Sequence, residues 1–360
     1  MRMKKKAMIA MSGGVDSSVS AALMQEAGYD CIGVTMKLYQ NEDAGIERGK
    51  TCCAVSDVLD AEQAAFRLGM PHYVFNFTED FRRQVMEHFV ETYEAGGTPN
   101  PCIDCNRYMK FEKLYQRAQL LDCDILVTGH YARVSYDEER GRWLLKKGKD
   151  AAKDQSYALY SLTQEQLAHI RFPLGEMESK EAVRKIAEAH GFRNARKQDS
   201  QDICFVPDGE YASFIARFRG KEPVGGPFLD KEGHVLGQHR GIVHYTIGQR
   251  RGLGIPSAER LYVCEKDPRT NTVILGRDED LYKKELLAED FNWIAMEEPK
   301  EPVSVQAMIR YRAKEVPAVA SVNPDGTVRI LFETAVRAPA RGQAVVLYDG
   351  DIVIGGGRIC

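Results

Sequence analysis

One short stretch near the N-terminus sets the strongest limit on how this chain can fold. The apolar run Ala7–Met11 is typical of a buried parallel strand, and it leads directly into Ser12–Ser18, which reads Ser-Gly-Gly-Val-Asp-Ser-Ser. Apolar side chains then recur at helical spacing over Val19–Tyr29. The pattern predicts a strand, a tight glycine turn and a helix, which is the unit from which parallel α/β sheets are built.

The glycine turn has the chemistry of a phosphate-binding loop. Gly13 and Gly14 lack a Cβ, so the backbone can approach a ligand closely, and the helix start offers unpaired N–H groups. The lysine of a Walker A loop and the Gly-x-Gly-x-x-Gly of a dinucleotide-binding turn are absent, but Asp16 stands where an acid can hold Mg²⁺ beside phosphates. An ordinary strand-to-helix turn would also use Ser and Gly. The complete seven-residue string instead resembles the pyrophosphate loop of ATP pyrophosphatases, enzymes that adenylate an oxygen and release pyrophosphate.

Composition narrows the classes of protein further. The 360 residues, 44% hydrophobic and 28% charged, are typical of a soluble globular protein of two or three domains. A net charge of −3 argues against a globally basic nucleic-acid binder, so RNA contacts would come from local patches. No apolar run approaches the ~20 residues of a membrane span or forms a signal peptide. We therefore expect a cytoplasmic protein with no membrane partner, whose nine cysteines are reactive or metal-bound rather than a disulfide framework.

The chain divides into three predicted domains. Residues 1–205 alternate strand-like and helical stretches, which predicts an α/β doubly wound parallel sheet. Residues 206–284 hold short segments broken by Gly and Pro, and we expect a small mixed domain there. Residues 285–360 read as short strands joined by turns, which predicts an antiparallel β-barrel.

Three further stretches read as strands of the N-terminal sheet, namely Cys31–Tyr39, His72–Phe77 and Asp124–Thr128. Ligands of such sheets bind at the carboxyl ends of the strands. We therefore expect Met36 and Gly129-His130 to lie along the same edge as the glycine turn.

Two cysteines stand in a stretch rich in helix breakers, Gly97–Asn106. Cys102-x-x-Cys105 is compatible with half of a zinc site, a redox pair or two members of a catalytic set; a structural zinc site would need a second such pair, and the sequence has none. Cys105 is predicted near a helix start, where the helix dipole lowers the pKa of a thiol. Cys204 also lies in a polar segment, which makes a buried core role a poor interpretation for it.

Motifs along the whole chain carry a closer resemblance. Beyond Ser12–Ser18 they are Asn100–Asn106, Thr128–Ala132, Lys153–Tyr157, Asp199–Phe205 and Tyr245–Gly254. Together they resemble the bacterial tRNA-specific 2-thiouridylases. The resemblance implies an enzyme that uses ATP to replace O2 of the wobble uridine of tRNA with sulfur.

The same resemblance implies a reaction sequence and partners. Transfer of AMP to O2 turns a poor leaving group into a good one, and pyrophosphate departs with its Mg²⁺. A persulfide on Cys204 then attacks C2, and Cys105 is the nucleophile that releases the sulfur by forming a disulfide with Cys204. The implied partners are the anticodon stem-loop of tRNA and a persulfide donor, such as a cysteine desulfurase or a sulfur-carrier protein.

Site residues carry over from the matching motifs. The ATP-binding residues would be Ala10, Met11, Ser12, Gly13, Gly14, Val15, Asp16, Ser17, Met36 and Gly129, with Asp16 also holding Mg²⁺. The target base would be bordered by Asn100, Pro101, Cys102, His130 and Gln343. The tRNA contacts would be Lys153, Asp154, Gln155, Arg310 and Tyr311.

One position departs from part of the family. Some members have an aspartate, the expected acid/base, where this chain has Cys102. Here Cys102, Cys105 and Cys204 could instead hold a [4Fe-4S] iron–sulfur cluster with one open iron. Both the disulfide route and the cluster route stay open at this stage.

Two basic segments are candidate RNA contacts, since positive charge beside an aromatic ring suits phosphate contact and base stacking. Gly237–Gly252 contains His239, Arg240, His244, Arg250 and Arg251 and no acidic residue. Arg310, Arg312 and Lys314 surround Tyr311 on an expected barrel strand. Two other functions remain as alternatives: another ATP-pyrophosphatase ligase, amidating or argininosuccinate-forming, and a non-catalytic RNA-binding module.

Overall fold

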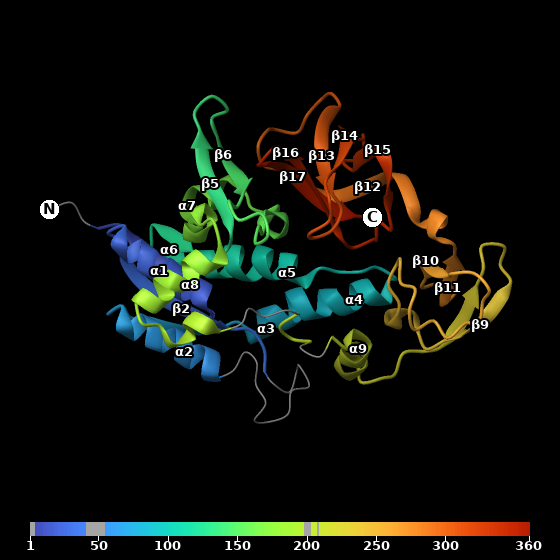
Figure 1. Cartoon of the computed structure of the whole chain (residues 1–360), viewed down its shortest axis with the longest axis horizontal. Helices are drawn as coiled ribbons and strands as arrows, with labels where there is room; N and C mark the ends of the chain where they lie inside the picture. Colours follow the sequence, from blue (N-terminus) through green and yellow to red (C-terminus); the bar gives the residue numbers. More distant parts are fainter. Residues whose placement is uncertain (1–3, 41–54, 198–202, 207–208) are drawn as a thin grey trace.

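The computed structural model describes residues 4–40, 55–197, 203–206 and 209–360. Figure 1 shows an α/β part built from the N-terminal half, a C-terminal part of strands, and a smaller group of strands between them in sequence. The predicted fold class is confirmed, because a parallel sheet, a small mixed sheet and a closed antiparallel barrel follow one another. Within the described residues, no helix combines the length and the apolar character needed to cross a membrane.

The N-terminal sheet has the strand order β3-β2-β1-β4-β7, and every neighbouring pair is parallel. Its strands are β1 (Lys6–Ala10), β2 (Asp30–Lys37), β3 (His72–Asn76), β4 (Ile125–Val127) and β7 (Ile170–Arg171). The helices α1 (Val15–Glu26), α2 (Val55–Arg67) and α8 (Lys180–Ala189) pack beside it. From β1 the chain adds β2 and β3 on one side and then β4 and β7 on the other, so the strand order reverses between β1 and β4. Ligands of such sheets bind at this switch point. The glycine turn follows β1, so it lies at the switch point.

Two long helical stretches follow β3, and the second contains Cys102 and Cys105. The first runs through α3 (Thr78–Phe81), the π-helical η1 (Arg82–Glu87) and α4 (His88–Glu94). The second runs through α5 (Pro101–Asp104), the π-helical η2 (Cys105–Leu114) and α6 (Tyr115–Leu120). The helix start predicted near Cys105 is confirmed. The π-helical geometry was not predicted, and such segments are frequent at functional sites.

A hairpin that the sequence analysis missed joins the N-terminal part to the barrel. β5 (Ala132–Asp137) and β6 (Arg142–Lys147) follow β4, yet Lys146 of β6 pairs with Ile352 of β17. The sheet order is β12-β15-β14-β13-β16-β17-β6-β5, and an additional β12–β17 pairing closes the barrel. Its remaining strands are β12 (Tyr282–Trp293), β13 (Val303–Met308), β14 (Val316–Val322), β15 (Val328–Arg337), β16 (Ala344–Asp349) and β17 (Ile352–Ile359).

The central part is a small mixed sheet of order β10-β11-β8-β9, in which only the β8–β11 pair is parallel. Its elements are α9 (Tyr211–Arg219), β8 (Gly226–Leu229), β9 (Val235–His239), β10 (Tyr262–Asp267) and β11 (Thr272–Gly276). Between the hairpin and the central part lie α7 (Gln164–His169) and short 3₁₀ turns, among them η3 (Ser156–Leu159) and η5 (Arg193–Arg196). β10 and β11 form an antiparallel hairpin, with Asn271 near its tip at a φ of 51°.

Candidate active site

The glycine turn after β1 is tightly enclosed. Gly13 has a φ of +76°, and a Cβ built on it would lie 2.2 Å from the carbonyl oxygen of Asp57 in α2. Only glycine fits there without displacing α2. The Ser17 hydroxyl donates to the Gly14 carbonyl at 3.0 Å and accepts from the Ser12 N–H at 3.2 Å. The backbone and hydroxyl donors of the turn are therefore held in a fixed arrangement.

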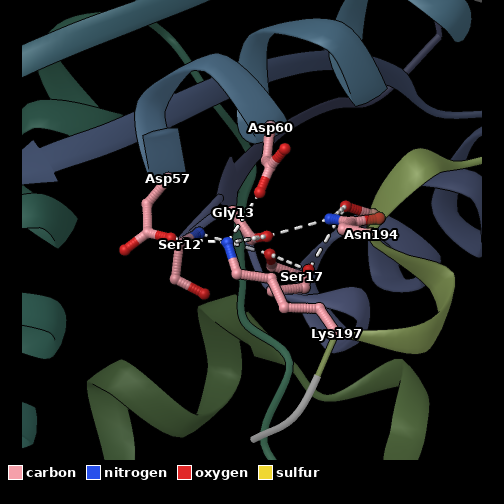
Figure 2. A network of polar contacts seen from close by, with 9 residues as sticks. Ser12, Gly13, Ser17, Asp57, Asp60, Asn194 and Lys197 are labelled. Atoms are coloured by element: carbon pink, nitrogen blue, oxygen red, sulfur yellow. Dashed lines mark hydrogen bonds and ion pairs between the residues drawn. The ribbon is translucent and has the colours of Figure 1, made fainter. Parts of the chain in front are cut away.

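Two side chains from the segment around η5 reach this turn, as Figure 2 shows. Asn194 Nδ2 donates to the Gly13 carbonyl at 2.9 Å and to Ser18 Oγ at 3.0 Å. Lys197 Nζ donates to Asp57 at 2.5 Å and Asp60 at 2.6 Å, and it lies 3.5 Å from the Gly13 carbonyl. Burial alone would lower the pKa of Lys197, but its hydrogen bonds to the two carboxylates raise it. A lysine cation thus stands beside the turn although the turn itself contains none.

Asp16, in the first turn of α1, contacts another lysine and a tyrosine. Its carboxylate accepts from Lys180 Nζ at 2.7 and 2.8 Å and from the Tyr131 hydroxyl at 2.8 Å. A Cβ on Gly129, just past β4, would lie 3.0 Å from Asp16 backbone and side-chain atoms. The turns after β1 and β4 therefore pack directly on each other, as the switch-point argument predicted.

The remaining candidate nucleotide residues lie along the same edge. The Met11 N–H donates to the Val34 carbonyl at 2.8 Å, which fixes the end of β1 against β2. The Thr35 hydroxyl donates to the Met11 carbonyl at 2.8 Å. Met36 follows Thr35 and is partly buried. The structure thus gathers Ala10–Ser17, Met36 and Gly129 around one edge of the sheet.

Cys105 lies at the junction of α5 and η2. The helix begins at Pro101 with Asn100 as its N-cap, so Cys105 follows the four residues of α5. Burial raises the pKa of the Cys105 thiol to about 11, although the charge of Lys110 acts in the opposite direction. The expectation of a lowered thiol pKa is therefore wrong for this conformation, because desolvation by burial outweighs the lowering by the Lys110 charge.

Lys110 connects Cys105 to a buried histidine. Its Nζ donates to Asn106 Oδ1 at 2.9 Å and lies 3.5 Å from His130 Nε2. His130 Nδ1 lies 2.7 Å from the Thr128 hydroxyl. Burial, and secondly the Lys110 charge, hold the pKa of His130 well below its usual range, so the imidazole is neutral. The sequence analysis missed Lys110, although its spacing of four residues from Asn106 on a predicted helix was a readable signal.

Cys204 lies in the segment that precedes α9, and its backbone is tied to the end of β2. Its carbonyl accepts a 2.6 Å hydrogen bond from Tyr39, just past β2. The next residue, Phe205, is fully buried with its ring centroid 5.3 Å from Phe89 and 5.1 Å from Phe214. Asp199–Asp202, which precede Cys204 in its motif, lie outside the described residues. Cys204 and Cys105 pack against the same hydrophobic cluster.

The thiols do not form a ready metal site. Among the described residues, which include Cys102, Cys105 and Cys204, no group of three or more His, Cys, Asp or Glu side chains could hold a metal ion. Cys102 is exposed, whereas Cys105 and Cys204 are partly buried. A cluster on these three thiols would therefore require them to move together.

A narrow cavity lies between the N-terminal part and the barrel, and of the five candidate base-binding residues, all of them described, Asn100 alone lines it. Its lining includes His88, Asn100, Asp104, Tyr160 and Arg358. Gln343, expected to meet the base, donates instead to the Thr98 carbonyl at 2.9 Å and the Pro99 carbonyl at 3.3 Å. It thereby ties the barrel to the loop that precedes Asn100.

The structure brings two candidate tRNA-contacting segments together. The Tyr311 hydroxyl donates to the Asp154 carbonyl at 3.2 Å, and Tyr311 remains 39% exposed. Gln155 is held by the backbone of Tyr131, and the Asp154 carboxylate accepts from the Ser156 hydroxyl at 2.8 Å. The expectation that Tyr311 lies on a barrel strand is wrong. β13 ends at Met308, and Tyr311 lies in a turn, where it can reach Asp154.

The basic segment of the central part is smaller than its sequence indicates. His239 is 3% exposed, its Nε2 lies 3.0 Å from the Asn271 carbonyl, and burial lowers its pKa. It therefore contributes packing rather than surface charge. Arg250 and Arg251 are exposed and remain available for a phosphate.

Comparison with known proteins gives matches along the whole chain. Residues 5–208 match the family described as "tRNA methyl transferase HUP domain", residues 212–277 the "tRNA methyl transferase PRC-barrel domain", and residues 283–359 the "Aminomethyltransferase beta-barrel domain". The chain is 50% identical over 359 residues to the tRNA-specific 2-thiouridylase MnmA of Clostridioides difficile strain 630, with 100% of this chain and 99% of that protein covered. It is 49% identical over 359 residues to the protein of the same name from Acetivibrio thermocellus, with 99% of each covered.

Proposed function

Because the chain belongs to the tRNA-specific 2-thiouridylase family, whose members are tRNA sulfurtransferases, we propose that it thiolates the wobble uridine of tRNA at C2 through an adenylated intermediate. Formation of 2-thiouridine in tRNA follows from the family. One observation carries the finer proposal. The enclosed glycine turn lies at the switch point, its Asp16 contacts Gly129 and Lys180, and Lys197 lies beside its Gly13 carbonyl.

The first half of the reaction uses the nucleotide edge. Ala10–Ser17, Met36 and Gly129 bind ATP, and the uracil O2 attacks the α-phosphorus, with pyrophosphate as the leaving group. The fixed N–H and hydroxyl donors of the turn stabilise the charge on that pyrophosphate. Lys180 and Lys197 stand close enough to the turn to add positive charge once a phosphate competes with their carboxylate partners.

Mg²⁺ fits the donor set of this edge. Asp16 offers carboxylate oxygens, which Mg²⁺ prefers, and its side chain is 27% exposed beside the hydroxyls of the turn. Asp16 would hold the ion, which supplies charge neutralisation of the phosphates when bound. The iron–sulfur alternative fits less well, because the three thiols are not gathered among the described residues.

The second half uses the two cysteines. The terminal persulfide sulfur of Cys204 bonds to C2 as the bond from C2 to the AMP oxygen breaks. The Cys105 thiolate then attacks the Cys204 sulfur, which forms the disulfide and leaves both electrons of the broken S–S bond on the new C2 sulfur. The pKa of about 11 at Cys105 means that this thiol must lose its proton when substrate binds.

The proposal also assigns the residues that bind the target base and the tRNA. Asn100, Pro101, Cys102, His130 and Gln343 border the base, and Lys153–Gln155 with Arg310 and Tyr311 contact the anticodon stem-loop. The target uridine must leave its stack to reach them. A cysteine desulfurase or a sulfur-carrier protein supplies the persulfide. We assign the nucleotide and thiol chemistry to residues 1–205, with 206–284 and 285–360 as RNA-contacting domains of a cytoplasmic enzyme.

The test is incubation of the protein with ATP, Mg²⁺, unmodified tRNA and inorganic polysulfide, followed by mass spectrometry of the tRNA nucleosides. We expect 2-thiouridine together with AMP and pyrophosphate. An amidating or argininosuccinate-forming ligase would make AMP only with its own substrates, and a non-catalytic RNA-binding module would release no pyrophosphate. Either result in place of 2-thiouridine would contradict the proposal.

A further inference from the structure

A histidine–carboxylate pair lies beside the Asn100 loop and has no role in the reaction described above. His88 opens α4 and Asp104 closes α5, and His88 Nδ1 lies 2.8 Å from Asp104 Oδ2. The Asp104 side chain is 5% exposed, whereas that of His88 is 29% exposed. Both residues line the narrow cavity that Asn100 also lines. A buried carboxylate therefore holds an imidazole that stays accessible from the cavity.

Few other titratable groups face this pair. Arg358 of β17 lies 3.6 Å from the second Asp104 oxygen, so both carboxylate oxygens have a cationic or N–H neighbour. Tyr160 lines the cavity from η3's C-terminal side, and burial raises its pKa to about 12, so its hydroxyl stays protonated. Arg358 and Tyr160 cannot take up a proton near neutral pH, which leaves His88 as the group at this cavity suited to acid–base work.

The contact with Asp104 decides which imidazole nitrogen carries the proton. A carboxylate can only accept, so the hydrogen lies on Nδ1, and the neutral ring keeps a lone pair on Nε2. The Thr92 hydroxyl lies 3.5 Å from Nε2, which is too long for a firm hydrogen bond. Nε2 is thus an acceptor held at a fixed orientation, as in a general base positioned by a carboxylate.

We propose that His88 is the acid–base residue for N3 of the target uracil and that Asp104 positions it. The inference rests on the proposed function, because it requires Asn100 to border the target base. It also requires the cavity to widen when tRNA binds, since it is too narrow for a base as it stands.

The proton balance fits a single residue that acts twice. When uracil O2 bonds to the α-phosphorus, the N3–H proton must leave for the adenylated base to be neutral, and Nε2 of His88 accepts it. The ring becomes an imidazolium whose Nδ1–H remains on Asp104. Displacement of AMP leaves N3 without a proton in the disulfide-linked intermediate. When the Cys105 thiolate breaks the S–S bond and its electron pair stays on the C2 sulfur, the imidazolium returns the proton to N3, which again carries hydrogen in 2-thiouridine. His88 is then neutral and ready for the next cycle.

The experiment compares His88→Asn with His88→Gln in the full-length protein, using single-turnover pyrophosphate release at saturating ATP and tRNA between pH 5 and 9. Asn places an amide N–H near the position of Nδ1, so Asp104 keeps its partner while the Nε2 acceptor is lost. We expect both variants to slow pyrophosphate release by about 100-fold, the usual contribution of a general base. Their tRNA affinity should be unchanged, and the pH dependence of the rate should flatten.

His190→Asn is the matched control, because His190 also pairs with a carboxylate, at 3.1 Å from Glu26, and its side chain is 30% exposed. It should keep the wild-type rate and pH profile. Wild-type rate and profile in His88→Asn would show that the pair only joins α4 to α5 and would overturn the inference. If wild-type protein forms 2-thiouridine, the proposed function stands whatever the His88 variants do; if it forms none, both fall together.

Discussion

The glycine turn and the cysteine region differ in how far they are assembled. At the turn, the backbone, the serine hydroxyls, Asp16 and the two lysines already make mutual contacts within 3.5 Å. In the cysteine region, Cys105 is partly buried with a raised pKa, Cys102 is exposed, and no metal-binding group forms among the described residues. The nucleotide half of the site is thus built by the fold, whereas the sulfur half must be completed by what binds.

This difference matches the chemistry of the two halves. Phosphate charge is present as soon as ATP binds, so preorganised donors stabilise it without rearrangement. In the proposed mechanism, an ionised Cys105 at rest would attack the persulfide on Cys204 and release its sulfur too early. On that proposal, a Cys105 that stays protonated until the base arrives would protect the sulfur. The comparison therefore predicts that changes at the turn act at once on ATP, and that changes near the cysteines act through protonation or tRNA.

Gly13→Ala should have the largest effect, because it disrupts the preassembled glycine turn. The residue has a φ of +76°, which costs an L-residue about 1–2 kcal/mol, and its Cβ would lie 2.2 Å from the Asp57 carbonyl. We expect ATP-dependent pyrophosphate release to fall by at least about 100-fold and the melting temperature to drop. Gly28→Ala is the control, because its φ is +89° but a Cβ there meets nothing within 4 Å. Equal losses in both variants would show that only backbone strain matters.

Lys197→Met tests the cation beside the turn. The change leaves Asp57 and Asp60 unpaired near the place where phosphates would bind, so it should weaken ATP binding roughly tenfold, as expected from a charge-assisted hydrogen bond of about 1.5 kcal/mol. Isothermal titration calorimetry with ATP measures this. Lys231→Met removes an exposed lysine–aspartate pair in the central part and should leave the affinity unchanged. Unaltered ATP binding in Lys197→Met would show that Lys197 does not contribute to the nucleotide site.

Lys110→Met tests how the lysine charge affects the protonation of Cys105. The Lys110 charge lowers the pKa of Cys105, which burial raises to about 11, so its removal should move the thiol titration to still higher pH. Alkylation of the Cys105 peptide, followed by mass spectrometry between pH 8 and 11, should be slower by roughly threefold to tenfold at each pH. Lys113→Met, on the same helix but paired with Asp80, serves as the control. Fast alkylation of wild-type Cys105 at pH 7 would contradict the protonated resting state.

Arg310→Ala should have the smallest effect, confined to tRNA. Loss of one phosphate contact should lower affinity severalfold at low salt and reduce the slope of log K against log salt by about one. A filter-binding titration over several salt concentrations would show it. Arg329→Ala, which removes an exposed arginine paired with Glu285 on the barrel, should change neither quantity. An unchanged salt slope in Arg310→Ala would place the tRNA elsewhere.

The sequence predicted those features that a short stretch determines by itself. The strand, turn and helix around Gly13, the switch-point edge with Gly129, and the barrel hairpins all follow from local spacing and turn residues. The sequence did not predict what depends on distant segments. The β5–β6 hairpin leaves its own domain to pair with β17, and Lys180 and Lys197 reach the turn from far along the chain.

Burial explains the two errors of chemistry. Cys105 was expected to be acidic because of the helix start, and His239 was counted as surface charge, yet both side chains are desolvated by segments that the local sequence does not reveal. The His88–Asp104 pair was missed for a related reason. Its members lie in separate helices, and no motif connects them.

The most direct measurement is the nucleoside content of tRNA, together with pyrophosphate release, for wild-type protein and Cys204→Ser under identical conditions with ATP, Mg²⁺ and polysulfide. The account predicts that the wild type forms 2-thiouridine and that Cys204→Ser still releases pyrophosphate on a single turnover but forms none. Undiminished 2-thiouridine formation by Cys204→Ser would contradict it.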